Sequence, residues 1–261
     1  NNMKSISLFF LSFALISPVF LFSQVEEKNP DVTDKEEEAW ELREDEEEIS
    51  DKNQAHWAGI DIGFGMNLNS DFSNDFSSTN NPYWENEVGK SLTMNFNFLE
   101  YKLPILKQYL GLTTGLGIDF QLINFSSNYV LAHDADTVYA VDDPVQSYKS
   151  NYLSLTRLKV PLLIEFATKK ETKKCFYFSA GVVGSVRIGS FMRLTGKYDN
   201  GDKFDNTTTS KFNLNPFGLE GTIRTGYDRY GAFVSYNLLP LFKENKTVAV
   251  NPIRFGVSFN F

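Results

Sequence analysis

Apolar and polar residues alternate with a period of two along much of this chain. In the segment 56–68, every second residue from Ala58 to Leu68 is apolar, and glycine, aspartate or asparagine stands between them. The segments 92–98 and 110–122 repeat the pattern. Because successive side chains of a β-strand point to opposite faces, the alternation predicts strands with one apolar and one polar face.

Five further segments carry the alternation and bring the number of predicted strands to eight: 152–166, 175–188, 217–225, 230–238 and 253–261. The connections between strands alternate in length. Long polar connections span 69–90, 126–150, 190–213 and 242–250, and short ones span 100–108, 167–174 and 226–229. Outer-membrane barrels have long extracellular loops and short periplasmic turns. Residues 55–261 are therefore predicted to be all-β and to form an eight-stranded antiparallel transmembrane β-barrel with such loops and turns.

The positions of the charged residues distinguish a membrane barrel from a soluble one. A soluble barrel holds its apolar residues inside, whereas a membrane barrel turns them toward lipid, where an Arg or Lys costs about 2–4 kcal/mol near the midplane. Nine charged residues of the predicted strands lie opposite the apolar face: Asp61, Asp119, Arg157, Lys159, Glu165, Arg187, Glu220, Arg224 and Arg254. We predict that they fill the lumen as paired ions.

Aromatic residues gather near one end of the predicted strands, the periplasmic end. They are Phe98, Tyr101, Tyr109, Phe166, Phe176, Tyr227 and Tyr230. Membrane barrels carry girdles of aromatic residues at the lipid–water interface, so this clustering also favours a membrane barrel.

Pro161 lies inside the fourth predicted strand. Proline has no backbone N–H and removes a hydrogen bond from the ladder between strands. We therefore expect a bulge or a local break in strand pairing at this position.

The amino terminus has the three parts of a secretory signal. A positive start at Met3-Lys4 precedes an almost wholly apolar run from Ile6 to Phe22, and small Ser23 follows. Residues 1–23 are predicted to be a signal peptide cleaved after Ser23. The alternative is an uncleaved membrane anchor; Pro18 and the acidic flank favour cleavage.

A strongly acidic tail follows the signal. Between Glu26 and Lys52 the sequence holds 14 Asp or Glu and 4 Lys or Arg. Residues 24–54 contain too few apolar residues to bury a core, so a disordered or loosely helical periplasmic tail is expected, a possible handle for a protein partner. The rest of the chain is close to neutral and has no Lys/Arg cluster, so no nucleic-acid partner is expected.

Three segments resemble the PorT-like outer-membrane β-barrel family of Bacteroidetes. They are Tyr109-Leu-Gly-Leu-Thr-Thr-Gly-Leu-Gly117, the run Tyr152–Phe166 with its Val-Pro-Leu-Leu core, and the closing run Ile253–Phe261. The signal ending in Ser-Gln is also similar. The resemblance covers about residues 55–261 and implies the fold and the outer membrane of a Gram-negative cell. One namesake is linked to type IX secretion, while many members have no assigned activity.

The carboxyl terminus resembles the signal that the outer-membrane insertion machinery recognises. Its outward-facing residues alternate and end in an aromatic residue: Phe255, Val257, Phe259 and Phe261. The expected partners are therefore outer-membrane lipid and this machinery.

The chain has two histidines and one cysteine, which limits the chemistry available to it. His56 and His133 are expected at opposite ends of the barrel, so they cannot share a metal, and no cofactor is expected. His133 with Asp134 and Asp136 is a candidate base–carboxylate arrangement for a hydrolase; the alternative is a solvated loop histidine. Asp136-Thr137-Val138 resembles the three-residue O-glycosylation site of Bacteroidetes.

These observations predict a non-enzymatic structural or accessory component of the cell outer membrane, for secretion or assembly. Eight strands enclose only enough space for their own side chains, so a plugged lumen is expected rather than a pore. Contacts with a protein partner would be made by the extracellular loops or the acidic tail. The alternative is an outer-membrane hydrolase acting on lipid or peptide at the extracellular rim.

Overall fold

The computed structural model describes residues 54–79, 82–126, 129–134, 136–142, 147–169, 174–198 and 200–261. The predicted signal peptide, and the predicted acidic tail up to residue 53, lie outside the described residues. In the described part of the chain, no helix is long and apolar enough to cross a membrane.

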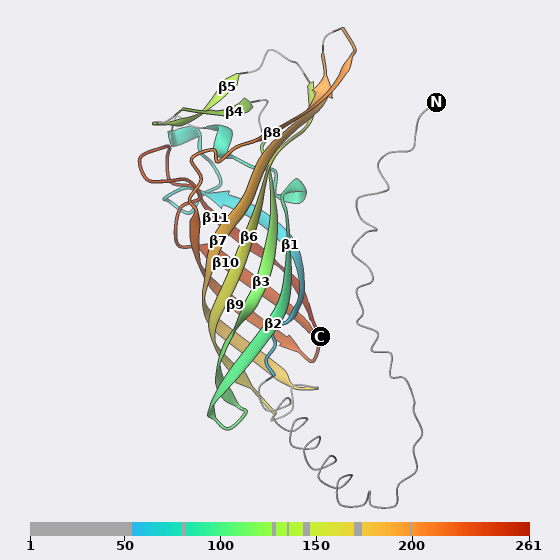
Figure 1. Cartoon of the computed structure of the whole chain (residues 1–261), viewed down its shortest axis with the longest axis vertical. Coiled ribbons are helices and arrows are strands. Elements are labelled where there is room, and N and C mark those ends of the chain that lie inside the picture. The colour runs from blue at the N-terminus through green and yellow to red at the C-terminus, as the bar shows by residue number, and fades with distance from the viewer. Residues whose placement is uncertain are drawn as a thin grey trace, which may run out of the picture. The chain divides into compact units, whose positions relative to one another are not determined.

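Eight antiparallel strands form a closed ring (Figure 1). Their order around the ring is β1–β2–β3–β6–β7–β9–β10–β11, and β11 pairs with β1. Each strand has a hydrogen-bonded neighbour on both sides, so the ring has no open edge. The predicted all-β, eight-stranded antiparallel barrel is confirmed. The strands are β1 Gly59–Leu68, β2 Leu92–Leu106, β3 Leu110–Asn124, β6 Ser147–Ala167, β7 Phe176–Lys197, β9 Phe217–Tyr227, β10 Tyr230–Asn237 and β11 Asn251–Asn260.

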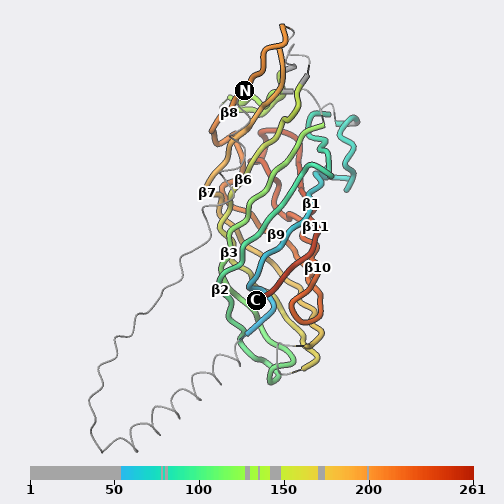
Figure 2. The backbone as a smooth tube through the Cα atoms, turned by 90° about the vertical axis from the view of Figure 1, so that its right-hand side faces the viewer, coloured from blue at the N-terminus to red at the C-terminus, as the bar shows by residue number. Residues whose placement is uncertain are grey.

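The connections define two ends of the barrel, here named the turn end and the loop end (Figure 2). At the turn end, residues 107–109, 168–175 and 228–229 join successive strands, and the carboxyl-terminal Phe261 lies there. At the loop end, the connections span 69–91, 125–146, 198–216 and 238–250. They contain the 3₁₀ helices η1 Ser77–Thr79, η2 Pro82–Trp84 and η3 Val88–Lys90, and the strands β4 Tyr129–His133, β5 Val138–Asp142 and β8 Lys203–Thr209.

Part of the predicted loop sequence is strand. β4 and β5 pair with each other, and β8 pairs with Phe191–Lys197 of β7. The same stretch of β7 also pairs with the first residues of β6, from Ser147 to Ser154. Residues 147–151 of β6 lie beyond the last pair of β6 with β3, at Tyr152, and form with this stretch of β7 and with β8 a three-stranded extension of the ring, here named the projecting sheet (Figures 1 and 2). Its sequence does not show the long apolar alternation of the ring strands, which is why these residues were predicted to be loop.

The predicted connection 100–108 is wrong, because β2 continues into it past a β-bulge at Phe98. The pairing of β2 with β3 shifts between Asn97 and Leu99, and the strand then continues to Leu106. An extra residue exchanges the two faces of a strand. Beyond the bulge, Tyr101 is therefore exposed and Lys102 is buried in the lumen.

The strand pairing is interrupted at Pro161, as expected. Between β3 and β6, neither Val160 nor Pro161 is paired. The pairing resumes in the same register at Gly117 and Lys159. On its other side, β6 pairs with β7 through this position without a shift. The missing N–H is therefore accommodated inside a continuous strand.

The barrel has an apolar exterior and a polar interior. Ile62, Ile164 and Val257 face outward with more than half of their surface exposed, whereas Asn97 and Thr113 on the opposite face are buried. Only an exterior that contacts lipid stabilises such an inversion. Exposed aromatic residues surround the turn end: Phe98, Tyr101, Phe166, Phe176, Tyr227 and Tyr230.

Candidate functional site

The lumen contains charged side chains from most of the ring strands. Of the nine residues predicted there, eight are buried and Arg187 is half-buried. Lys102 is a further buried cation, which the sequence analysis missed because it assigned this segment to a turn. The signal for it was present, since apolar residues alternate again from Leu99 to Ile105 with the opposite phase.

Asp61 and Arg224 form a bidentate ion pair across the lumen. Two guanidinium nitrogens of Arg224 donate to the two carboxylate oxygens of Asp61, each at 2.8 Å. Asn95 and Asn97 also donate to this carboxylate, at 3.1 Å each. Because β10 and β11 lie between β9 and β1 in the ring, the pair connects two strands that do not pair with each other.

A second group of ion pairs lies closer to the loop end. Arg254 donates to Asp119 at 2.8 Å and also contacts Glu220, and Lys159 lies 3.1 Å from Glu220. Arg157 lies 3.7 Å from Asp119 and donates to Gln121 at 3.1 Å. The group joins β3, β6, β9 and β11. Buried charges are tolerated when they are paired in this way.

A third group closes the turn end. Glu165 accepts a hydrogen bond from Lys102 at 2.9 Å and another from the backbone N–H of His56 at 3.0 Å. The His56 ring lies 3.1 Å from the same carboxylate and stacks on Tyr177 with ring centroids 4.0 Å apart. Its Nε2 lies 3.6 Å from Sγ of Cys175. His56, Glu165 and Cys175 are all buried, and their contacts hold one segment of the chain in place at the turn end.

The segment held there is residues 54–58, here named the entry segment. Glu100 accepts backbone N–H groups of Ala55, Trp57 and Ala58 at 2.7–2.9 Å. Trp57 is buried, and the Arg224 guanidinium lies 5.1 Å from the centroid of its ring. No sequence pattern predicted that the entry segment fills the turn end, because its contacts join residues on distant strands.

The loop end is covered by a packed apolar cluster. Its buried members come from all four loop-end connections and from the ends of ring strands, and include Phe76, Trp84, Phe125, Leu155, Phe212 and Phe242. The Trp84 indole N–H donates to the Thr247 hydroxyl at 2.9 Å. The loops therefore form a compact cap over this end of the lumen.

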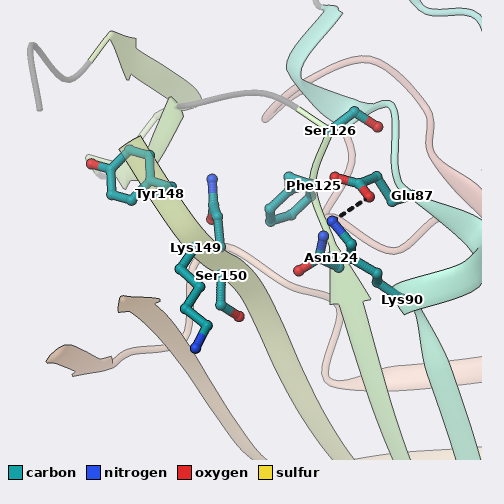
Figure 3. A pocket seen from close by; sticks show the side chains of 9 residues that line it. Glu87, Lys90, Asn124, Phe125, Ser126, Tyr148, Lys149 and Ser150 are labelled. Carbon is teal, nitrogen blue, oxygen red and sulfur yellow. Dashed lines mark ion pairs between the residues drawn. The ribbon is translucent and has the colours of Figure 1, made fainter. Parts of the chain in front are cut away.

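Beside the cap lies a shallow polar cavity of about 60 Å³ (Figure 3). Lys90 turns toward Glu87, with the two charged groups 2.7 Å apart, while Tyr148 and Lys149 line the other side. Its volume suits a few water molecules.

His133 lies at the loop end, and its ring Nε2 is 2.6 Å from the hydroxyl of Ser210. Among the described residues, the candidate base–carboxylate arrangement of His133 with Asp134 and Asp136 is not formed. Asp134 accepts the backbone N–H groups of Asp136 and Thr137, at 2.7 Å each, and Asp136 lies 3.7 Å from Lys246. Carboxylates two or three residues apart in a tight turn bind their own backbone. Ser210 had no recognisable signal in the sequence.

The turn after β4 is expected to loosen in acid. The backbone N–H groups of Thr137 and Asp136 hold the pKa of Asp134 below its usual value. A carboxylate with a lowered pKa stabilises the folded turn at higher pH, and this contribution is lost as the pH falls through the lowered value. Amide hydrogen exchange at Asp136 and Thr137 should therefore become less protected below about pH 4. Unchanged protection in acid would show that the Asp134 carboxylate does not hold the turn. The variant Asp134→Asn should already lower the protection of these two amides at neutral pH.

The remaining predicted residues are on the surface. Phe255, Val257, Phe259 and Phe261 all face outward and are exposed. Thr137, in the segment similar to a glycosylation site, is exposed, whereas Val138 is buried. Within the described residues, no cluster of three His, Cys, Asp or Glu side chains is suited to hold a metal ion.

The closed ring, the lipid-facing exterior and the ion-filled interior define a membrane β-barrel. A family model described as the outer membrane protein beta-barrel domain matches residues 24–244. The chain therefore belongs to this family and is an outer-membrane β-barrel protein. No curated protein matches the chain significantly.

Proposed function

We propose that this protein is a non-conducting, non-enzymatic accessory component of the outer membrane. The observation that carries the proposal is that the lumen is obstructed along its length. Ion pairs cross it, the entry segment fills the turn end, and the apolar cap covers the loop end. An interior filled by side chains leaves no continuous passage for solutes, so the function falls to surfaces outside the ring.

The projecting sheet is the surface we propose for contact with a partner protein. In the described part of the chain, β8 pairs with β7 alone, so its outer edge is open. Exposed strand edges bind extended segments of other proteins through backbone hydrogen bonds. The aromatic rings of Tyr148, Phe204 and Tyr198 pack in sequence on this sheet, with centroids 5.7 and 5.0 Å apart. Aromatic side chains are enriched at protein interfaces.

The finer parts of the proposal rest on the sequence. The resemblance to PorT-like barrels supports a role in secretion or assembly, in a Bacteroidetes outer membrane. We place the turn end and the acidic tail in the periplasm and the projecting sheet outside the cell, because an even number of strands brings both termini to the periplasmic side.

Site-specific photo-crosslinking in intact cells tests the partner surface. A benzoylphenylalanine at Tyr198 should yield protein adducts, whereas the same group at lipid-facing Val257 should not. Equal yields at the two positions would contradict the proposed surface. A parallel experiment with a chain lacking residues 26–52 measures the contribution of the acidic tail.

Planar-bilayer recording tests the closed lumen. Purified protein is expected to give no steady openings on the nanosiemens scale, because paired side chains occupy the narrow interior. A diffusion porin reconstituted in the same bilayers is the positive control. Steady openings of that size would overturn the non-conducting proposal.

The contact between Ser210 and His133 favours a second candidate function, hydrolysis at the loop-end rim. A histidine at 2.6 Å is close enough to take the hydroxyl proton while the serine oxygen attacks an acyl carbon. Among the described residues, no carboxylate contact orients His133. A fluorophosphonate probe should label Ser210 in the wild type and not in Ser210→Ala or His133→Ala. The matched control is Thr209→Ala, which changes the residue before Ser210, at the end of β8. Absence of labelling in the wild type would exclude this candidate.

A further inference from the structure

Two arginines with the same charge lie directly opposite each other inside the barrel. Arg157 of β6 is the cross-strand partner of Arg187 of β7. Like charges in directly opposite positions destabilise a sheet. The regular ladder between β6 and β7 runs from Ala167 to Arg157 and places the two arginines opposite each other, and a bulge follows on the loop-end side, where Thr156 pairs with Gly189 and Ile188 is the extra residue. Bulges that redirect side chains are frequent beside functional sites.

The carboxylates near these arginines are already engaged. Asp119 and Glu220 contact Arg254, and Glu220 also contacts Lys159. Arg157 lies 3.7 Å from Asp119, beyond hydrogen-bond distance. Among the residues that the structure describes, this part of the lumen therefore contains two carboxylates and four cations, an excess of two positive charges.

Arg187 has no carboxylate contact among the described residues. Its guanidinium donates to the Ser190 hydroxyl at 2.9 Å and to the backbone carbonyls of Asn215 and Leu214 at 3.4 Å each. Two of these three contacts are long for hydrogen bonds. Arg187 is half-buried whereas Arg157 is buried, so the pair extends from the interior toward the loop end.

We propose that Arg157 and Arg187 together bind an oxyanion of the phosphate class. A phosphate group carries close to two negative charges at neutral pH, which matches the local excess. Two guanidinium groups present planar pairs of N–H donors, the geometry that suits phosphate oxygens. The phosphate group belongs either to a free anion or to the headgroup of a lipid.

Phosphate binding is measured in neutral detergent micelles. Inorganic phosphate is titrated by calorimetry at constant ionic strength, with chloride as the balancing anion. A second set of micelles contains phosphatidic acid, whose headgroup is followed by ³¹P NMR. Saturable binding in either set supports the site and identifies the source of the anion. Absence of binding in both sets would overturn the proposal.

Substitutions at Arg187 distinguish the site from general charge attraction. Arg187→Gln should weaken binding about tenfold or more, since it removes a charge-assisted contact. Arg187→Lys keeps the charge but loses the paired donors, so intermediate weakening is expected. Arg193→Gln is the matched control on the same strand, because Arg193 is paired with Asp205 at the surface. Equal weakening in Arg187→Gln and Arg193→Gln would contradict the assignment.

Thermal stability separates a binding role from a purely structural one. In chloride, Arg187→Gln should unfold at or above the wild-type temperature, because the repulsion from Arg157 is removed. Phosphate should raise the unfolding temperature of the wild type and leave that of the variant unchanged. If the variant unfolds at a lower temperature in both salts by the same amount, Arg187 is structural and the proposal fails.

Discussion

Replacing Arg224 with methionine is expected to lower the free energy of unfolding by about 3–5 kcal/mol. Arg224 and Asp61 are both buried, and they share two hydrogen bonds of 2.8 Å. Among the described residues, the substitution leaves the Asp61 carboxylate in the lumen with two neutral amide donors, Asn95 and Asn97. An uncompensated buried charge costs far more than the pair itself contributes. Urea unfolding in detergent micelles, followed by tryptophan fluorescence, measures the change.

Two variants make this prediction specific. Arg229→Met removes an exposed arginine at the turn end and should change the free energy of unfolding by less than about 0.5 kcal/mol. The double variant Asp61→Asn with Arg224→Met removes both charges and should be more stable than Arg224→Met alone. If the two substitutions are additive, the bidentate pair is not the source of the effect.

Replacing Trp57 with alanine is expected to release the entry segment from the turn end. Loss of a buried tryptophan costs about 3–5 kcal/mol, and here the cost falls on a short segment rather than on the whole ring. The open form should therefore become about 100-fold more populated or more. Cys175 reports this opening, because it is the only cysteine, is fully buried and lies against His56 of the entry segment. Maleimide labelling of Cys175 should accelerate by the same factor.

Glu100 and Tyr230 provide the companion variants. Glu100→Gln replaces the carboxylate that accepts three backbone N–H groups of the entry segment by a neutral amide, which is a weaker acceptor. Labelling of Cys175 should therefore also accelerate, but by a smaller factor than in Trp57→Ala. Tyr230→Ala removes an exposed aromatic residue at the same end and should leave the rate unchanged. If Trp57→Ala labels at the wild-type rate, the entry segment does not cover Cys175 in solution.

Both effects follow from the way the interior is filled. Eight strands enclose a narrow space, and this protein occupies it with ion pairs and with a segment from its own amino-terminal side. The charges in the lumen connect strands that do not pair with each other, such as β1 with β9. The lumen therefore stabilises the barrel, and this is why we propose that recognition of a partner falls to the surface beyond the ring.

Much of the ring was predictable from the sequence, because strand alternation is a local property. Outward-facing Leu158, Leu162 and Ile164 and lumen-facing Arg157 and Lys159 follow from the period of two alone. The prediction was wrong at the ends of β2, β6 and β7. A bulge reverses the phase of β2, and the outer parts of β6 and β7 lack the long apolar alternation by which ring strands were recognised.

The sequence by itself determined that the chain forms alternating strands, that the apolar face is the outer one and, with the exception of Lys102, which charges lie inside. The tertiary structure alone decided which of those charges meet, because Asp61 and Arg224 are 163 residues apart and approach only when the ring closes. It also decided the contact of Cys175 with His56, the contact of Ser210 with His133 and the opposition of Arg157 to Arg187. The physical reason is that alternation is set by the backbone of one strand, whereas pairing, bulges and contacts across the lumen depend on how distant strands align.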